Sequence, residues 1–262
     1  MTGRSFGEEG GRLSYGSYLR LSQLLDQQRL LSDPPAHDEL LFITVHQVYE
    51  LWFQLLLFEL ETVRDLLREG ADLWTPRRLL DRCAVIERML VAQVDVIETM
   101  TPQDFLEFRS LLAPGSGFQS VQFRELEFLS GAKDPSYLER LHDARPAELA
   151  RLRRRLSEPT LWDAFLDAMA GQGLPVEDPE ERMASLQEVA TNRERHRALW
   201  DVAEGLVTHD ELSAAWRSRH VAMVERQIGT KSGTGGSTGA PYLRSRLHFH
   251  YYPELWDLRS RL

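Results

Sequence analysis

Residues 40–60 read LLFITVHQVYELWFQLLLFEL, a nearly continuous apolar run that contains one histidine, His46. Wound as a helix, the run carries apolar side chains on every face, so we expect a helix that is buried on all sides. Asp38 precedes it as an N-cap residue and Gly70 follows its last apolar turn, which places the helix at about residues 39–68. His46 is a polar residue inside this helix and needs a partner.

The same helical spacing of apolar residues recurs along most of the chain. It predicts further helices at about residues 14–31, 79–97, 118–131, 137–156, 160–170, 179–206 and 209–228, with a break at Thr208. Thr101 and Pro102 form an N-cap followed by proline at the first helical position. The glycine-rich residues 229–241 are too flexible for a regular element. Without a convincing strand or a long linker, we expect an all-α helical bundle and a single domain over residues 1–262.

The composition excludes several classes of function. The 262 residues include 40 acidic and 31 basic side chains, a net charge of −9, which does not suit nucleic acid or an anionic membrane surface. Polar residues within 40–60 argue against a membrane span, and the first residues lack the apolar segment of a secretory signal. Cys83 is the one cysteine, which excludes internal disulfides and fits a reducing cytoplasm. A small uncharged or zwitterionic partner is expected.

His46 shares its helix face with aromatic residues. Phe42 precedes it by one turn, and Tyr49 and Phe53 follow it. A buried imidazole needs a hydrogen-bond partner, which a planar aromatic ligand with an N–H would supply. The alternative is a core histidine satisfied by a neighbouring carbonyl group, and the spacing alone favours that alternative.

Two more residues are candidates for a site. His220 is flanked on its helix by Trp216 and Val224, surroundings in which haem proteins place the proximal ligand, although many helices bury such a histidine without a metal. Arg109 follows Phe105 by one turn, and an arginine among aromatics either reaches solvent or binds a carboxylate in a dry pocket. The spacing leaves both alternatives open for each residue.

Four long segments, in order, resemble those of the tryptophan 2,3-dioxygenase family. They are FITVHQVYELWFQLLLFEL, DFLEFRSLLAPGSGFQSVQFRELEFLSG, RHVAMVERQIG and GTGGSTGAPYL. LSYGSYLRLSQLL near the start and YPELWDLRSRL at the end are similar to the terminal segments of the family. The resemblance extends from about Leu13 to Leu262. It favours functional roles for His46 and His220 over the purely structural explanations.

This resemblance implies a b-type haem, a role for each matching residue, and a homotetramer in which residues 1–32 of one subunit complete the neighbouring site. His220 matches the proximal iron ligand, with Trp216 and Val224 beside it against the haem. His46 matches the distal histidine that accepts a hydrogen bond from the indole N–H. The other substrate-binding positions are Phe42 against the indole, Phe105 and Arg109 at the carboxylate, Thr234 at the amino and carboxylate end, and Tyr15, Tyr18 and Leu19 from the adjacent subunit.

At Phe105 some family members carry a tyrosine whose hydroxyl reaches the substrate carboxylate. This chain lacks that hydroxyl, so we expect carboxylate recognition to depend more on Arg109.

The function implied is insertion of O2 across the indole C2–C3 bond of L-tryptophan, giving N-formylkynurenine in the kynurenine pathway. An alternative with the same fold and haem is a mono-oxygenase of secondary metabolism that converts a substituted tryptophan or indole to an oxindole or hydroxyindole. A haem sensor or carrier without turnover is a third alternative. It would need no clamp for a zwitterion, so the pair Arg109 and Thr234 counts against it.

Overall fold

The computed structural model describes residues 14–70, 72–141, 144–235 and 239–262, and within these ranges it contains helices and no strand. The α-helices are α1 (Tyr15–Tyr18), α2 (Leu21–Leu24), α3 (Glu39–Glu69), α4 (Trp74–Ile97), α5 (Pro102–Arg109), α6 (Val121–Ser130), α7 (Ser136–Arg140), α8 (Pro146–Ser157), α9 (Leu161–Gly171), α10 (Pro179–Thr191), α11 (Arg193–Ile228), α12 (Ala240–Arg244) and α13 (Pro253–Leu258). Three short 3-10 helices are η1 (Ser110–Leu112), η2 (Gly117–Gln119) and η3 (Arg259–Arg261). The all-α prediction is confirmed.

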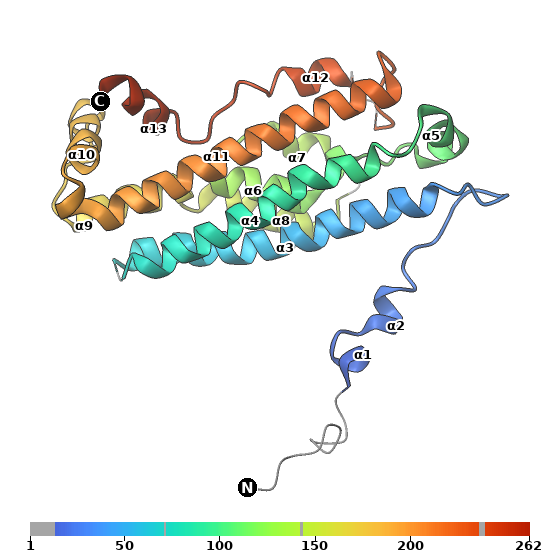
Figure 1. Ribbon diagram of the computed structural model, residues 1–262, viewed down its shortest axis with the longest axis horizontal. Coiled ribbons are helices and arrows are strands. Elements are labelled where there is room, and N and C mark those ends of the chain that lie inside the picture. Colours follow the sequence, from blue (N-terminus) through green and yellow to red (C-terminus); the bar gives the residue numbers. More distant parts are fainter. Residues whose placement is uncertain (1–13, 71, 142–143, 236–238) are drawn as a thin grey trace, which may run out of the picture.

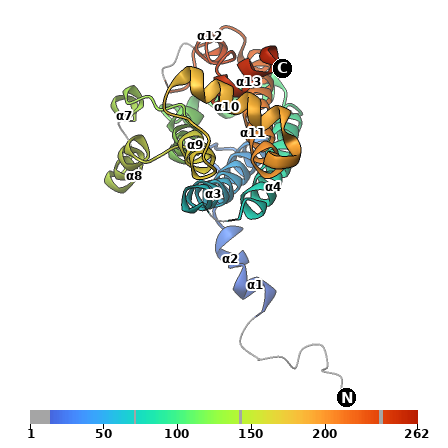
Figure 2. The same cartoon turned by 90° about the vertical axis from the view of Figure 1, so that its left-hand side faces the viewer.

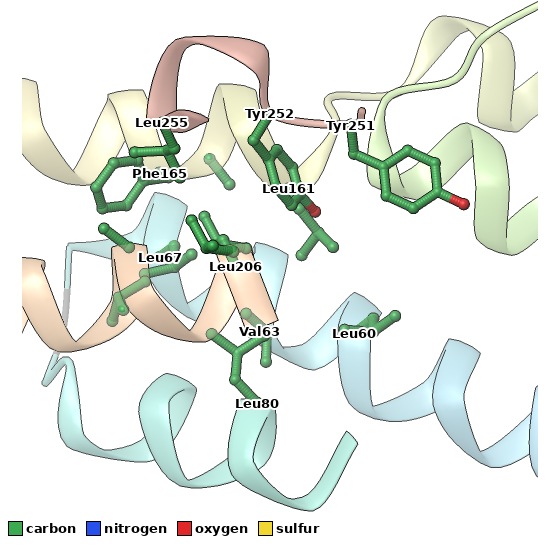
Figure 3. Close-up of a cluster of buried hydrophobic side chains, with 14 of the residues drawn as sticks. Leu60, Val63, Leu67, Leu80, Leu161, Phe165, Leu206, Tyr251, Tyr252 and Leu255 are labelled. Carbon is green, nitrogen blue, oxygen red and sulfur yellow. The ribbon is translucent and has the colours of Figure 1, made fainter. Parts of the chain in front are cut away.

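The long helices α3, α4 and α11 form the centre of the bundle, and α6 and α9 pack against them (Figures 1 and 2). α10 and α13 lie at one end of the bundle, and α5 and α12 lie near the other (Figure 1). Figure 3 shows part of this core, a cluster to which α3 contributes Val63 and Leu67, α4 contributes Leu80, α11 contributes Leu206 and α9 contributes Phe165. Burying these side chains is the main favourable contribution to folding.

Helix α3 is long and apolar enough, by length and composition alone, to cross a membrane. Its contacts are those of a core helix, because it packs on α4, α6 and α9. Leu60, Val63 and Leu67 on its inner face have no exposed surface. The prediction that α3 is buried on all sides is wrong for its outer face, where Leu51 and Phe58 are 48% and 66% exposed.

Several predicted helix boundaries are confirmed. Gly70 ends α3 in the left-handed conformation with φ of 67°, which glycine adopts without steric cost. Thr101 caps α5 by accepting a hydrogen bond from the Asp104 N–H, with Pro102 in the first turn. Asp38 is not the predicted side-chain cap of α3, because its carboxylate pairs with the ring of His37 at 2.6 Å instead.

Other boundaries differ from the prediction. The helix expected at 14–31 is two short helices separated at Arg20 (φ 51°), since this segment has no core surface on which to form longer turns. The helix expected at 137–156 is divided before Pro146, because the residue before a proline disfavours the helical conformation. The break predicted at Thr208 is wrong: its hydroxyl donates to the Glu204 carbonyl inside α11, and the chain breaks at Asn192.

The C-terminal segment is attached to the bundle through one buried carboxylate. Asp210 of α11 has no exposed surface, and its Oδ2 accepts hydrogen bonds from the backbone N–H groups of Tyr251 and Tyr252 and from the Trp256 indole N–H, at 2.9, 3.2 and 3.0 Å. Removal of this acceptor leaves three donors without a partner in a dry interior. Asp210 therefore holds α13 and the preceding loop in place.

We expect Asp210→Ala to lower the free energy of unfolding by about 3 kcal/mol, the cost of several buried donors left unsatisfied. Chemical denaturation followed by circular dichroism measures this change. Glu211→Gln, at the exposed neighbouring position of α11, is the matched control and should change the free energy little. An Asp210→Ala protein as stable as the control would contradict the attachment.

A second buried polar cluster joins α4, α6 and α11. His209 bonds through Nδ1 to the Glu87 carboxylate at 2.5 Å and through Nε2 to the Ser130 hydroxyl at 2.8 Å. Burial by itself would lower the pKa of His209, but the charge and hydrogen bond of Glu87 outweigh it and raise the pKa above its ordinary value. The protonated histidine is consequently favoured in the folded state.

Because the pKa of His209 is higher in the folded than in the unfolded chain, this pair stabilises the fold fully below about pH 6.5 and loses its contribution as pH rises through the folded-state pKa. We expect the wild-type free energy of unfolding to fall across that range more steeply than that of Glu87→Gln. Denaturation of both proteins at a series of pH values provides the comparison. Parallel pH profiles would refute the coupling.

Candidate functional site

One cavity collects most of the residues singled out in the sequence. It has a volume of about 310 Å³ and lies between α3, α5, α6, α11 and the loop that precedes α12. The predicted residues that line it are Phe42, His46, Phe105, Arg109, Trp216, His220, Val224 and Thr234. These residues come from three separated parts of the chain, so the fold brings them together.

The three remaining predicted residues lie elsewhere in this chain. Tyr15 and Tyr18 on α1 are 77% and 71% exposed, and Leu19 after α1 is 40% exposed. Figures 1 and 2 both show α1 and α2 projecting away from the bundle. We call residues 14–32 the N-terminal arm; it is fixed to the body where Glu39 accepts hydrogen bonds from the Leu31 and Ser32 N–H groups.

The tautomer of His46 follows from its hydrogen bond. Its Nδ1 lies 2.7 Å from the Phe42 carbonyl oxygen, and because a carbonyl can only accept, Nδ1 carries the proton. Burial lowers the pKa of His46, so the ring stays neutral near pH 7. Nε2 is then an unprotonated acceptor. The Phe42 ring lies 4.1 Å from the His46 ring, centroid to centroid, which places a flat apolar surface beside it.

His220 is the second imidazole that lines the cavity. Burial, with a smaller effect of His46, lowers its pKa to about 4. At neutral pH the ring is therefore uncharged, the form in which imidazole binds a metal. The Trp216 indole stacks on this ring with 5.0 Å between centroids and 6° between planes.

Arg109 and Thr234 hold the glycine-rich loop over the cavity. Arg109 donates through Nη2 to the Ser232 carbonyl at 2.5 Å, and the Thr234 hydroxyl donates to the Gly115 carbonyl at 2.6 Å. Each contact joins the glycine-rich loop to a segment more than a hundred residues away in the sequence. Arg109 also lines the cavity, and its guanidinium has further N–H donors that a carboxylate can use.

Two glycines of this loop are required by geometry. A Cβ at Gly235 would lie 2.5 Å from the Ser116 Cβ, closer than real contacts allow. Gly239 has φ of 69°, a left-handed conformation that disfavours other residues, and a Cβ there would meet the Lys231 carbonyl oxygen at 2.8 Å. The predicted irregularity of residues 229–241 is confirmed for the described residues up to Gly239, while Ala240 already begins α12. Residues 236–238 lie outside the described residues.

Two buried arginines at the cavity were not predicted. Arg124 pairs with Glu127 and covers the Tyr137 ring, and Arg217 donates to the Phe249 carbonyl at 2.8 Å. Both line the cavity, and the Nε–H of each has no acceptor among the described residues. The spacing of three between Arg217 and His220 was an available signal, since such residues neighbour each other on a helix.

The donor set fits a metal that arrives with a macrocycle rather than a bare ion. Within the part of the chain that is described, no group of three histidine, cysteine or acidic side chains could hold a metal. The cavity instead offers one neutral imidazole, His220, inside an apolar and aromatic wall, with the cationic groups of Arg124 and Arg217 at its margin. A haem supplies four equatorial ligands itself, needs a flat apolar slot, and carries propionates that suit buried guanidinium groups.

Comparison with known proteins gives a consistent result. The family described as Tryptophan 2,3-dioxygenase matches residues 2–169 and 181–262. A protein named Tryptophan 2,3-dioxygenase from Nocardioides sp. is 63% identical, over 98% of each chain. Proteins of the same name from Herpetosiphon aurantiacus and Caulobacter vibrioides are 45% and 41% identical, each over 95% of this chain and 98% of the relative.

Proposed function

From the premise that the chain belongs to the tryptophan 2,3-dioxygenase family, we propose that its cavity binds a b-type haem on His220 and L-tryptophan against His46. The enzyme is an oxidoreductase that incorporates O2 across the indole C2–C3 bond of L-tryptophan, giving N-formylkynurenine. The observation that carries the substrate assignment is the Nδ1 hydrogen bond of His46 to the Phe42 carbonyl, which leaves Nε2 as an acceptor for the indole N–H.

The haem, when bound, supplies the activation of dioxygen. The contribution of the chain is to hold the indole ring in a fixed position, because fixing the geometry of the reacting groups lowers the activation barrier. Phe42 and Phe105, whose rings are 5.7 Å apart and stacked, limit the slot for the indole. His46 fixes the rotation of the ring in that slot by accepting its N–H. The indole N–H is a very weak acid, so His46 acts as an acceptor that orients the substrate and does not have to deprotonate it.

The opposite end of the site recognises a zwitterion. In this proposal Arg109 binds the carboxylate with its guanidinium fork, and Thr234, which lines the same cavity, contacts the amino and carboxylate end. Phe105 adds no hydroxyl, so the charge-assisted bonds of Arg109 are the main contribution to carboxylate binding.

The activity is tested by the mass of the product. Reduced, haem-loaded protein and L-tryptophan under air should give a product heavier by two oxygen atoms, both derived from labelled O2. A product with one added oxygen, or unchanged tryptophan, would contradict the proposal.

We expect His220→Ala to lose the haem or its axial histidine signature, because the other imidazole of the cavity wall, His46, lies on α3 and is held there by its hydrogen bond to the Phe42 carbonyl. Haem content and the Soret spectrum after reconstitution measure this. His248→Ala, an exposed histidine outside the cavity, is the control and should retain both. An unaltered Soret band in His220→Ala would refute ligation.

We expect Arg109→Ala to lower kcat/KM for L-tryptophan by roughly 10²-fold, since each charge-assisted hydrogen bond contributes about 1.5–3 kcal/mol and about 1.4 kcal/mol is tenfold. Arg109→Lys keeps the charge without the planar fork and should recover only part of the loss. Haem content should be normal in both variants. Wild-type kinetics in Arg109→Ala would contradict the carboxylate assignment.

The assembly is part of the proposal. We propose that residues 1–262 act as one catalytic domain in a cytoplasmic homotetramer and that the arm, with Tyr15, Tyr18 and Leu19, completes the site of a neighbouring subunit. Apolar side chains exposed on both the arm and the paired helices α3 and α4, among them Phe58 and Val85, support a second copy as the covering partner. Residues 1–13 of the proposed segment lie outside the described residues.

Mixing of two defective variants tests the exchange of arms. Tyr15→Ala combined with Tyr18→Ala removes the arm contacts, and Arg109→Ala removes the carboxylate clamp, so each homomeric protein should have low activity. After the two are dissociated and reassembled together, some sites would combine an intact arm from one subunit with an intact cavity from the other. We expect partial recovery of activity in the mixture. An arm that serves its own cavity would give no recovery.

A further inference from the structure

The orientation of the His220 ring has an unusual origin. Histidines that bind metals almost always donate their second ring N–H to a carboxylate, a carbonyl or a water molecule, which fixes the plane of the ring. His46 and His209, which are not proposed as metal ligands, each have a protein acceptor for one ring N–H, the Phe42 carbonyl and the Glu87 carboxylate. For His220, the described residues supply no hydrogen-bond partner to either ring nitrogen.

The contact that does fix the ring is the stack with Trp216. The two rings are one helical turn apart on α11 and almost parallel, at 6° and with 5.0 Å between centroids. Offset parallel stacking of this kind is a favourable aromatic geometry. Rotation of the imidazole about its Cβ–Cγ bond would break the stack, so the indole plane defines the imidazole plane.

Trp216 is itself held from two sides. The Tyr49 ring of α3 meets it edge-on at 6.2 Å and 74°, and the Phe123 ring of α6 packs on it at 5.1 Å. Tyr49 is fixed in turn by the hydrogen bond from its hydroxyl to the Leu90 carbonyl of α4, at 2.9 Å. Three helices therefore determine where the indole lies, and they do so independently of any ligand in the cavity.

We propose that Trp216 is the positioning residue of the proximal histidine, holding the imidazole plane of His220 by stacking where other metal sites use a hydrogen-bonded acceptor. The proposal rests on the proposed function in one respect, the ligation of haem by His220. Because no described protein group accepts a hydrogen bond from the second nitrogen, the orientation of the imidazole depends on the neighbouring ring. Loss of that ring frees the imidazole to rotate and to leave the metal.

The test uses haem-loaded wild type, Trp216→Phe, Trp216→Leu and Trp216→Met. Phenylalanine keeps a flat ring at the position, while leucine and methionine fill space without a plane; the methionine variant serves if the leucine variant does not fold. Trp162→Leu is the matched control, because it removes an indole that packs on Phe165 and Tyr252 and does not line the cavity.

Two readouts do not depend on turnover. Resonance Raman of the ferrous protein gives the position and width of the iron–histidine stretching band, and transfer to excess apomyoglobin gives the rate of haem loss. We expect Trp216→Phe to resemble wild type in both. Trp216→Leu and Trp216→Met should show a broadened, shifted band and haem loss faster by up to roughly tenfold, the upper end for one aromatic pair.

Wild-type band and rate in folded Trp216→Leu or Trp216→Met would overturn the proposal. So would an equal change in Trp162→Leu, which would make the effect one of general stability. Failure of the proposed function is distinguished by His220→Ala: an iron–histidine band that persists in that variant locates the ligand elsewhere, whatever Trp216 does.

Discussion

The structure depends on keeping two imidazoles uncharged inside an apolar bundle. His46 on α3 and His220 on α11 line the same cavity, and burial lowers the pKa of both, that of His220 to about 4. A charged imidazole there would carry a large desolvation cost, whereas a neutral one needs one acceptor for its N–H and one donor for its lone pair. In the proposed site, α3 presents an acceptor for an indole N–H, and α11 presents a lone pair for a metal.

The parts of the molecule around this cavity are held in different ways. The walls are helices whose aromatic rings pack against buried clusters, Phe42 and Phe105 against one and Trp216 against another. In the proposed site, the charged end of the substrate is met by the end of α5 and by the glycine-rich loop, which Arg109 and Thr234 hold by two hydrogen bonds to backbone carbonyls. The described residues of the arm do not line the cavity of their own chain, and Tyr15 and Tyr18 are largely exposed. In the proposed tetramer, slot, clamp and arm are separate elements that meet only after folding and assembly.

Much of the fold could be predicted, and the failures have identifiable causes. The helix at Glu39–Glu69 and its end at Gly70 follow from apolar periodicity and a glycine at the last turn, both local properties. The break was predicted at Thr208 but lies at Asn192. Thr208 does not end the helix, because its hydroxyl donates a local hydrogen bond to the Glu204 carbonyl inside α11. The arm was predicted as one helix because periodicity does not reveal whether a core exists for it to pack on.

For the site, the sequence by itself determined the candidate residues. It contained the aromatic residues around His46 and His220 and the ordered segments that resemble one family, and eight of the predicted residues line one cavity. Tertiary structure decided what periodicity cannot express: which nitrogen of His46 carries the proton, which ring orients His220, and that Arg124 and Arg217 reach the same cavity. The reason is that residue type and spacing set what lies on one face of a helix, whereas a hydrogen-bond acceptor or a stacking plane is supplied by elements distant in the chain.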